Sequence, residues 1–167
     1  MTKLSHKQMA LILGVATWPF PGVAQHACSP AKKFGVEQIV LPELRYRLID
    51  KFGSVQFCDP DCPSSCSLIG EREHAAAAFP QIRSQVQAFP AMVQRLGLGT
   101  KGEFSGEQKL SVYREYKKLL CGMSLAMQGE NHTFEFVAEG FRVEGMVSRK
   151  GEITVTNKEP AAVICPK

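Results

Sequence analysis

The chain has 167 residues and a net charge of +4 at pH 7, with 44% hydrophobic and 22% charged residues and six cysteines. This length fits one ordinary domain, and the apolar content excludes a wholly disordered chain. The small, scattered positive charge gives no basis for nucleic-acid binding. Beyond residue 24, no apolar run is long enough to form a transmembrane helix.

Residues 1–24 have the pattern of an export signal. Lys3 and Lys7 precede an apolar run over residues 9–18, which is shorter than the roughly 20 residues that span a bilayer. Small residues then lead to Ala24, after which a signal peptidase would cut. The sequence therefore predicts a signal peptide over 1–24, a linker or tether over 25–38, and a single domain over 39–167.

Cys28 has two interpretations. The run 27–29 looks like the start of a bacterial lipoprotein, in which the cysteine is acylated, whereas Gln25 and His26 depart from that pattern. The mature chain is then either anchored through a lipid on Cys28 or freely secreted. In both cases we expect a periplasmic or cell-surface location, and the lipid would be the chain's only link to a membrane.

Helical patterns fill the first half of the predicted domain. Helical spacing of apolar residues, with Pro42 in the first turn and Gly53 as a stop, predicts a helix over 41–52. A helix-favouring stretch over 71–78 is expected to end or restart at Pro80. An apolar stripe over 82–96, which includes Val86, then predicts an amphipathic helix that ends near Gly97.

A further helix is predicted from residue 105 to about residue 120. Ser105 and Gln108 have the spacing of a capping box, in which each side chain binds the backbone N–H of the other. The basic residues of this helix are interpreted as a solvated face that carries no ligand; they are Lys109, Arg114, Lys117 and Lys118.

After Gly122 the hydrophobic period changes from 3.6 to 2. Alternating residues predict strands over 134–138, 141–147 and 153–155, joined by short turns, with a possible edge strand over 123–127. Helices followed by such a meander indicate an α+β fold, with N-terminal helices packed on a three- to four-stranded antiparallel sheet. An uncovered sheet face or an edge strand is the expected place for a partner to bind.

The turn-rich stretch over 54–70 contains three of the six cysteines. In an exported protein the first expectation is disulfides, and the candidates are Cys58, Cys62, Cys66, Cys121 and Cys165. A bridge from Cys58 to Cys165 would fix the C-terminal tail to this stretch. The alternative is a zinc or copper site, or a redox-active thiol, built from Cys58, Cys62, Cys66 and His74.

Catalytic patterns are scarce in this sequence. It contains no nucleophile elbow, metalloprotease helix motif or phosphate-binding loop. The Asp59-Pro60-Asp61 segment is interpreted as turn chemistry, and no cofactor is predicted. We therefore assign no catalytic residue, and an enzymatic role is disfavoured although left open.

Three segments resemble a family of uncharacterised bacterial exported proteins and lipoproteins. They are LRYRLIDKFGSVQFCDPDC, EQKLSVYREYKKL and GFRVEGMVSRKGEITV. The resemblance implies no activity. It matches Cys58 and Cys165 to family cysteines, but this chain lacks the family's last cysteine and has Cys62 and Cys66 in addition. Those differences leave Cys62–Cys66 and Cys66–Cys121 as further possible bridges.

Together these features predict an exported, disulfide-stabilised envelope domain with a binding or structural role. Its expected partner is an unidentified envelope protein or surface. The rival hypothesis is a thiol-redox or metal-binding protein that uses the cysteine and histidine residues of the 58–74 segment.

Overall fold

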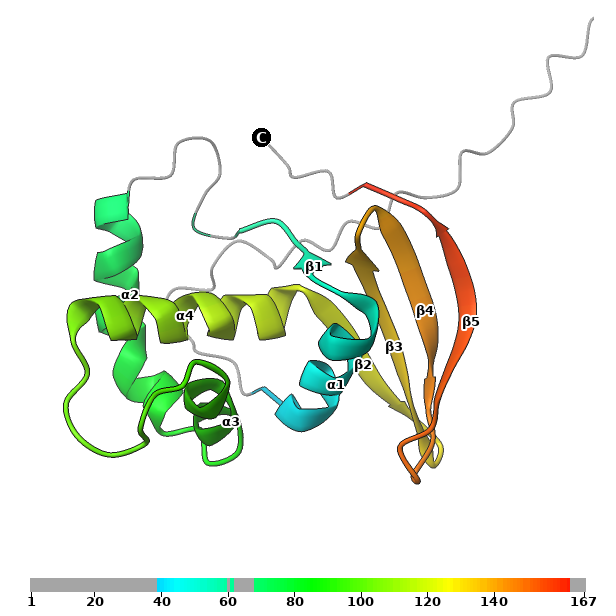
Figure 1. The fold of residues 1–167 in the computed structure, drawn as a ribbon, viewed down its shortest axis with the longest axis horizontal. Coiled ribbons are helices and arrows are strands. Elements are labelled where there is room, and N and C mark those ends of the chain that lie inside the picture. Colours follow the sequence, from blue (N-terminus) through cyan, green and yellow to red (C-terminus); the bar gives the residue numbers. More distant parts are fainter. Residues whose placement is uncertain (1–38, 60, 62–67, 163–167) are drawn as a thin grey trace, which may run out of the picture.

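The computed structural model describes residues 39–59, 61 and 68–162. Four helices, α1 (Pro42–Phe52), α2 (Leu68–Arg83), α3 (Ala88–Arg95) and α4 (Gly106–Cys121), accompany five strands. The strands are β1 (Val55–Gln56), β2 (Met123–Gln128), β3 (Asn131–Ala138), β4 (Phe141–Val147) and β5 (Ile153–Pro160). The predicted α+β class, with helices before an antiparallel sheet, is confirmed (Figure 1). Within the described ranges, no helix has the length and apolar character needed to cross a membrane.

The sheet is the expected meander with one short addition. Strands β2 to β5 follow one another, and each pairs antiparallel with the next. Strand β1 pairs with the far end of β3, where Val55 lies opposite Ala138. The sequence analysis placed this segment in a loop, because a two-residue strand has no hydrophobic period from which it could be recognised.

The alternation of side chains in the meander builds the sheet side of the core. Phe134 and Phe136 of β3 point toward α1 and contact Phe52, with ring centroids 6.1 and 5.6 Å from it. Gly145 lies opposite Phe134 in β4, and a methyl group there would collide with the Phe134 ring and the Thr154 carbonyl oxygen. This close approach allows the large rings to pack against the sheet.

The opposite face of the sheet carries charged side chains. Arg142 lies between two acidic residues of neighbouring strands, 3.3 Å from a carboxylate oxygen of Glu159 and 3.6 Å from one of Glu135. The expectation of one wet face is met only in part, because the Arg142 side chain is 12% exposed and Val137, its neighbour in β3, is buried. Whether a partner binds on that face or on an edge strand stays a prediction.

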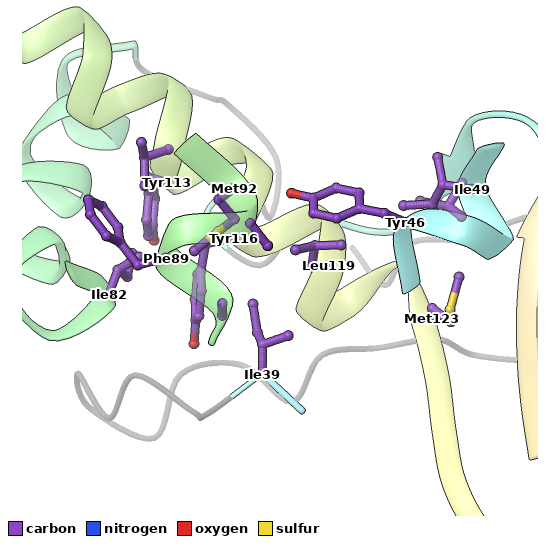
Figure 2. Close-up of a cluster of buried hydrophobic side chains, with 14 of the residues drawn as sticks. Ile39, Tyr46, Ile49, Ile82, Phe89, Met92, Tyr113, Tyr116, Leu119 and Met123 are labelled. Carbon is purple, nitrogen blue, oxygen red and sulfur yellow. The ribbon is translucent and has the colours of Figure 1, made fainter. Parts of the chain in front are cut away.

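The helices form the other part of the core around α4. Figure 1 shows α1 and the end of α4 beside the sheet, with α2 and α3 along the rest of α4. Figure 2 shows the side chains buried between these helices. They come from every described helix, from the residues before α1 and from the start of β2. Ten of them are labelled: Ile39, Tyr46, Ile49, Ile82, Phe89, Met92, Tyr113, Tyr116, Leu119 and Met123.

The predicted helix over 82–96 is wrong in its first part. Helix α2 continues through Pro80 to Arg83, and residues 84–87 then separate it from α3. Val86, expected in the buried stripe, is 86% exposed. The helix tolerates Pro80 because Phe79 and Ile82 stay packed in the core on either side of it. Pro90 is in the first turn of α3, where a missing N–H costs no intrahelical hydrogen bond.

The predicted boundaries of the other two helices are confirmed to within a residue. Helix α1 begins at Pro42 and its cap is Gly53. Helix α4 begins after Ser105, whose hydroxyl accepts from the Gln108 backbone N–H at 3.2 Å, while the Gln108 side chain accepts from the Ser105 N–H at 2.9 Å. Gly122 ends this helix. Local capping signals thus set both ends of α4.

Candidate functional site

Cys58 and Cys121 are buried and disulfide-bonded, and neither is a free thiol. Cys28, Cys62, Cys66 and Cys165 lie outside the described residues. The pairing of the cysteines and the lipid on Cys28 therefore stay predictions. The predicted signal peptide and tether, over 1–24 and 25–38, lie outside the described ranges as well.

Of the alternative metal set, the described residues include Cys58 and His74. A sulfur in a disulfide has no thiolate to offer a metal ion. The His74 Nδ1 atom lies 3.3 Å from a carboxylate oxygen of Asp61. Within the described part of the chain, no three His, Cys, Asp or Glu residues are placed to hold a metal ion.

Lys117 contradicts the expectation of a solvated basic face on α4. The residue is 3% exposed. Its Nζ atom lies 2.8 Å from both carboxylate oxygens of Asp59 and 3.0 Å from one oxygen each of Asp61 and Glu71. It also lies 4.9 Å from the centre of the Tyr113 ring. A lysine ammonium has three donor protons, and here all of them face acidic partners.

The two aspartates after Cys58 do more than form a turn. The Asp61 N–H does donate to the Asp59 carboxylate at 3.0 Å, as turn chemistry predicts. Both carboxylates, however, also bind Lys117, which is more than 50 residues away in the sequence. The Tyr113 hydroxyl donates to Asp61 at 2.8 Å. This segment is therefore fixed to the side of α4.

Glu71 joins α2 to the same site. The guanidinium of Arg114 donates to both of its carboxylate oxygens, at 3.1 and 2.6 Å. We call the whole group the Lys117 cluster; its members are Asp59, Asp61, Glu71, His74, Tyr113, Arg114 and Lys117. It links three segments of the chain: residues 59–61, α2 and α4.

The contacts of the Lys117 cluster shift the pKa values of three of its members. Burial by itself would lower the pKa of Lys117, but the hydrogen bonds that its ammonium donates to Asp59, Asp61 and Glu71 outweigh burial and raise that pKa. Hydrogen bonding to Arg114, and then to Lys117, lowers the pKa of Glu71 to about 2. Burial and the bond to Asp61 raise the pKa of Tyr113. At neutral pH the lysine and tyrosine thus hold their protons, so neither is a nucleophile or a general base.

We expect the Lys117 cluster to make the protein sensitive to acid. Because the pKa of folded Glu71 is about 2, below its usual value, the stability that this carboxylate supplies is complete above about pH 4.5 and lost as pH falls toward 2. The loss should be about 1–2 kcal/mol, since the half-exposed Arg114 is partly screened by solvent. Urea unfolding at several pH values should show the difference between wild type and Glu71→Gln shrinking over this range.

The control for this experiment is Glu73→Gln, on an exposed position of the same helix. That variant should follow the wild-type pH profile. A gap between wild type and Glu71→Gln that stays constant from pH 7 to pH 2 would contradict the role given to Glu71.

A second feature is a groove of about 610 Å³ at the start of α1. One wall comes from α1 and the residue before it, through Leu41, Leu44 and Arg47. The other comes from β3, the end of β4 and the following turn, through His132, Val147 and Arg149. These strand ends lie at the bottom of the sheet in Figure 1. The volume lies within the range of roughly 300–1,000 Å³ typical of ligand pockets.

The residues that lead into α1 are held rigidly at the rim of this groove. The Ile39 N–H donates to the Gln85 side chain at 3.1 Å, and Arg45 donates to the Val40 carbonyl at 3.1 Å. Leu41 has a φ of 52°, in the left-handed region, which costs a non-glycine residue free energy unless its surroundings enforce it. The side chains of Val40 and Leu41 are 52% and 36% exposed.

Comparison with known proteins adds no assignment: no family model, curated protein or solved structure matches this chain. The resemblance to exported proteins stays a prediction.

Proposed function

We propose that this protein is an exported, disulfide-stabilised domain of the cell envelope with a binding or structural role and no catalytic one. The observation that carries the proposal is the Lys117 cluster. In the 58–74 segment, which is the richest in reactive side chains, Asp59, Asp61 and Glu71 are bound by Lys117, Arg114 and Tyr113. These groups hold the fold together, which supports a structural use of this region.

The bonded state of Cys58 and Cys121 supports export. Disulfides persist in oxidising compartments such as the periplasm and the cell surface and are rare in the cytosol of most organisms. The signal-like residues 1–24 point to the same compartment. On this proposal Cys28 either carries a lipid or is one more cysteine of a secreted chain.

The rival proposal is a thiol-redox or metal-binding protein based on Cys58, Cys62, Cys66 and His74. One observation weighs against it: Cys58 is bonded, and a disulfide sulfur offers no thiolate to a metal or to redox exchange. An experiment on the full chain separates the two proposals, because structural disulfides and metal-bound thiolates react differently with alkylating reagents.

The test is the intact mass of protein recovered from its own envelope, measured with and without thiol alkylation. If Cys28 is free of lipid, we expect no thiol to be alkylated until the protein is denatured and reduced; if Cys28 carries a lipid, five cysteines remain and we expect one thiol at most to be alkylated. Labelling of two or three thiols in the native protein, directly or only after a chelator, would overturn the structural proposal in favour of the rival. Recovery from the cytosol with residues 1–24 still attached would overturn export.

The same spectrum decides the state of Cys28, since a lipid adds mass that a chain beginning at Gln25 lacks. A Cys62→Ser/Cys66→Ser variant gives an independent measurement. We expect purified wild type and variant to hold equal, negligible amounts of zinc and copper. Stoichiometric metal in the wild type that disappears in the variant would support the rival.

A further inference from the structure

We propose that the groove at the start of α1 binds an acidic peptide segment, with a carboxylate between Arg47 and Arg149 and an aliphatic side chain on the apolar rim. This inference rests on the proposed binding role and names its ligand. It differs from the sequence-based expectation, which placed a partner on the uncovered sheet face or on an edge strand.

The charge of the groove favours a carboxylate. Arg47 donates one hydrogen bond, from Nη2 to the Gly151 carbonyl oxygen at 2.9 Å, which fixes the guanidinium at the wall. A methyl group on Gly151 would lie 2.8 Å from that guanidinium, so the turn and the arginine are in direct contact. Arg47 is exposed, and its guanidinium has further N–H groups beyond the one bound to Gly151. Two such N–H groups side by side match the two oxygens of a carboxylate.

Arg149 supplies the second positive charge. Its partner is Glu130, at 3.3 Å, and both side chains are more than 70% exposed. An exposed ion pair of this kind contributes little free energy, so a ligand carboxylate can replace Glu130 at small cost. Among the described residues, Glu43 is the acidic residue that lines the groove, and the two arginines outweigh it.

The α1 terminus adds to the same potential. Glu43 and Leu44, in the first turn of α1, line the groove, and the side chain of Leu41 at the N-cap makes no capping hydrogen bond. The N–H groups of a first helical turn carry a partial positive charge. This effect supports the arginines and is not needed for the argument.

The apolar rim explains why the ligand is more than a bare anion. Leu41 lines the groove and is 36% exposed, and Leu44 and Val147 add to the apolar lining. Because Arg45 and Gln85 hold residues 39–41 in place, Leu41 is presented with little ordering cost on binding. An aliphatic side chain next to the carboxylate would cover these apolar side chains.

The two arginines beside a mostly apolar lining suit a ligand with one carboxylate and a short aliphatic group. A fatty acid carries the same two features, so laurate is the competing ligand in the test below. Two arginines partly offset by Glu43 are in turn too few for a nucleic acid, whose binding requires many phosphate contacts.

The test uses three fluorescent hexapeptides with the disulfide-intact protein. The first ends in Leu-Leu with a free carboxylate, the second is its C-terminal amide, and the third is the amide with an internal Glu-Leu-Leu. We expect the first or the third to bind about tenfold more tightly than the second, and the better of the two identifies the source of the carboxylate. Amide chemical shifts should change at residues 41–47 and 147–151.

Three variants locate the binding energy. Arg47→Gln should weaken the better peptide about tenfold and Arg149→Gln several-fold, since each removes a charged donor. Arg72→Gln removes another exposed arginine, which lies on α2 and pairs with Glu107 of α4, and it should leave binding within twofold. Unchanged spectra elsewhere in each variant show that the fold is intact.

Several outcomes would overturn the proposal. Equal affinity of the amide, unaffected binding in both groove variants, or tighter binding of laurate than of any peptide would each exclude an acidic peptide ligand. Shifts confined to the polar sheet face or to β5 would place binding elsewhere and leave the proposed binding role intact. No binding at millimolar peptide would reject this ligand, while the alkylation experiment still decides the proposed function.

Discussion

Replacement of Lys117 by methionine should lower the free energy of unfolding by about 3–5 kcal/mol, the usual cost of removing one partner from a buried charge network. Methionine keeps most of the side-chain volume, so the loss measures charge and hydrogen bonding. Asp59, Asp61 and Glu71 would then face one another without the ammonium that lies within 3.0 Å of each. Urea unfolding at pH 7 with the disulfides intact measures the change.

Lys118→Met is the matched control. Lys118 is the next residue of α4, but its side chain is 26% exposed and its contact with Glu115 is 3.4 Å long. Its loss should cost less than about 1 kcal/mol. A cost for Lys117→Met no larger than that of the control would show that the Lys117 cluster contributes nothing to stability, and it would remove the observation that carries the proposed function.

A double variant tests whether the cluster acts as a unit. Glu71→Gln removes one of the carboxylates that would repel each other once Lys117 is gone. The combined loss for Lys117→Met and Glu71→Gln should therefore be smaller than the sum of the single losses, as expected for residues in one network. Strict additivity would mean that the two side chains act independently.

The parts of the fold that could be predicted from sequence are those with local signals. The ends of α4 followed from Ser105, Gln108 and Gly122, which act within one helical turn. The meander followed from the period-2 pattern of residues such as Phe134 and Phe136. In each case the residues that specify an element also form it.

The misplaced elements depend on distant partners. Strand β1 exists because Val55 and Gln56 pair with the end of β3, more than 80 residues later. The interval between α2 and α3 arises where Gln85 turns to bind the Ile39 N–H. Neither interaction leaves a pattern in the neighbouring sequence. The apolar spacing through Val86 therefore predicts one continuous helix over residues 84–87, where the structure has a connection between α2 and α3.

The sequence does carry a signal for the buried position of Lys117. On α4 it falls on the same helical face as Leu110 and Tyr113, both buried. A charged residue at a core position requires buried partners of opposite charge. Asp59 and Asp61 supply such charges, and their contacts with Lys117 join the segment after Cys58 to α4. The groove offered no such signal, because Arg47 and Gly151 meet across 104 residues.

Arg45 is the second residue whose loss should be large. It is 6% exposed, and burial lowers the pKa of its guanidinium. One nitrogen, Nη1, donates at 2.8 Å to the carbonyls of both Leu119 and Met123. These oxygens belong to the last turn of α4 and the start of β2, where a cation interacts favourably with the helix dipole.

Arg45→Met should therefore lower the free energy of unfolding by about 2–4 kcal/mol, because buried carbonyls lose charged donors. The loss for Arg45→Lys should be smaller than that for Arg45→Met but still measurable, because one ammonium cannot reach all three carbonyl oxygens that the planar guanidinium binds. Arg72→Met, at an exposed ion pair, should change stability by less than about 0.5 kcal/mol. Equal losses for Arg45→Met and Arg72→Met in urea unfolding would contradict this role.

Arg45 also binds the Val40 carbonyl at the rim of the groove. Arg45→Met should therefore speed hydrogen exchange of the Leu41–Arg47 amides more than that of the β3 amides. This difference would separate loosening of the groove rim from global unfolding.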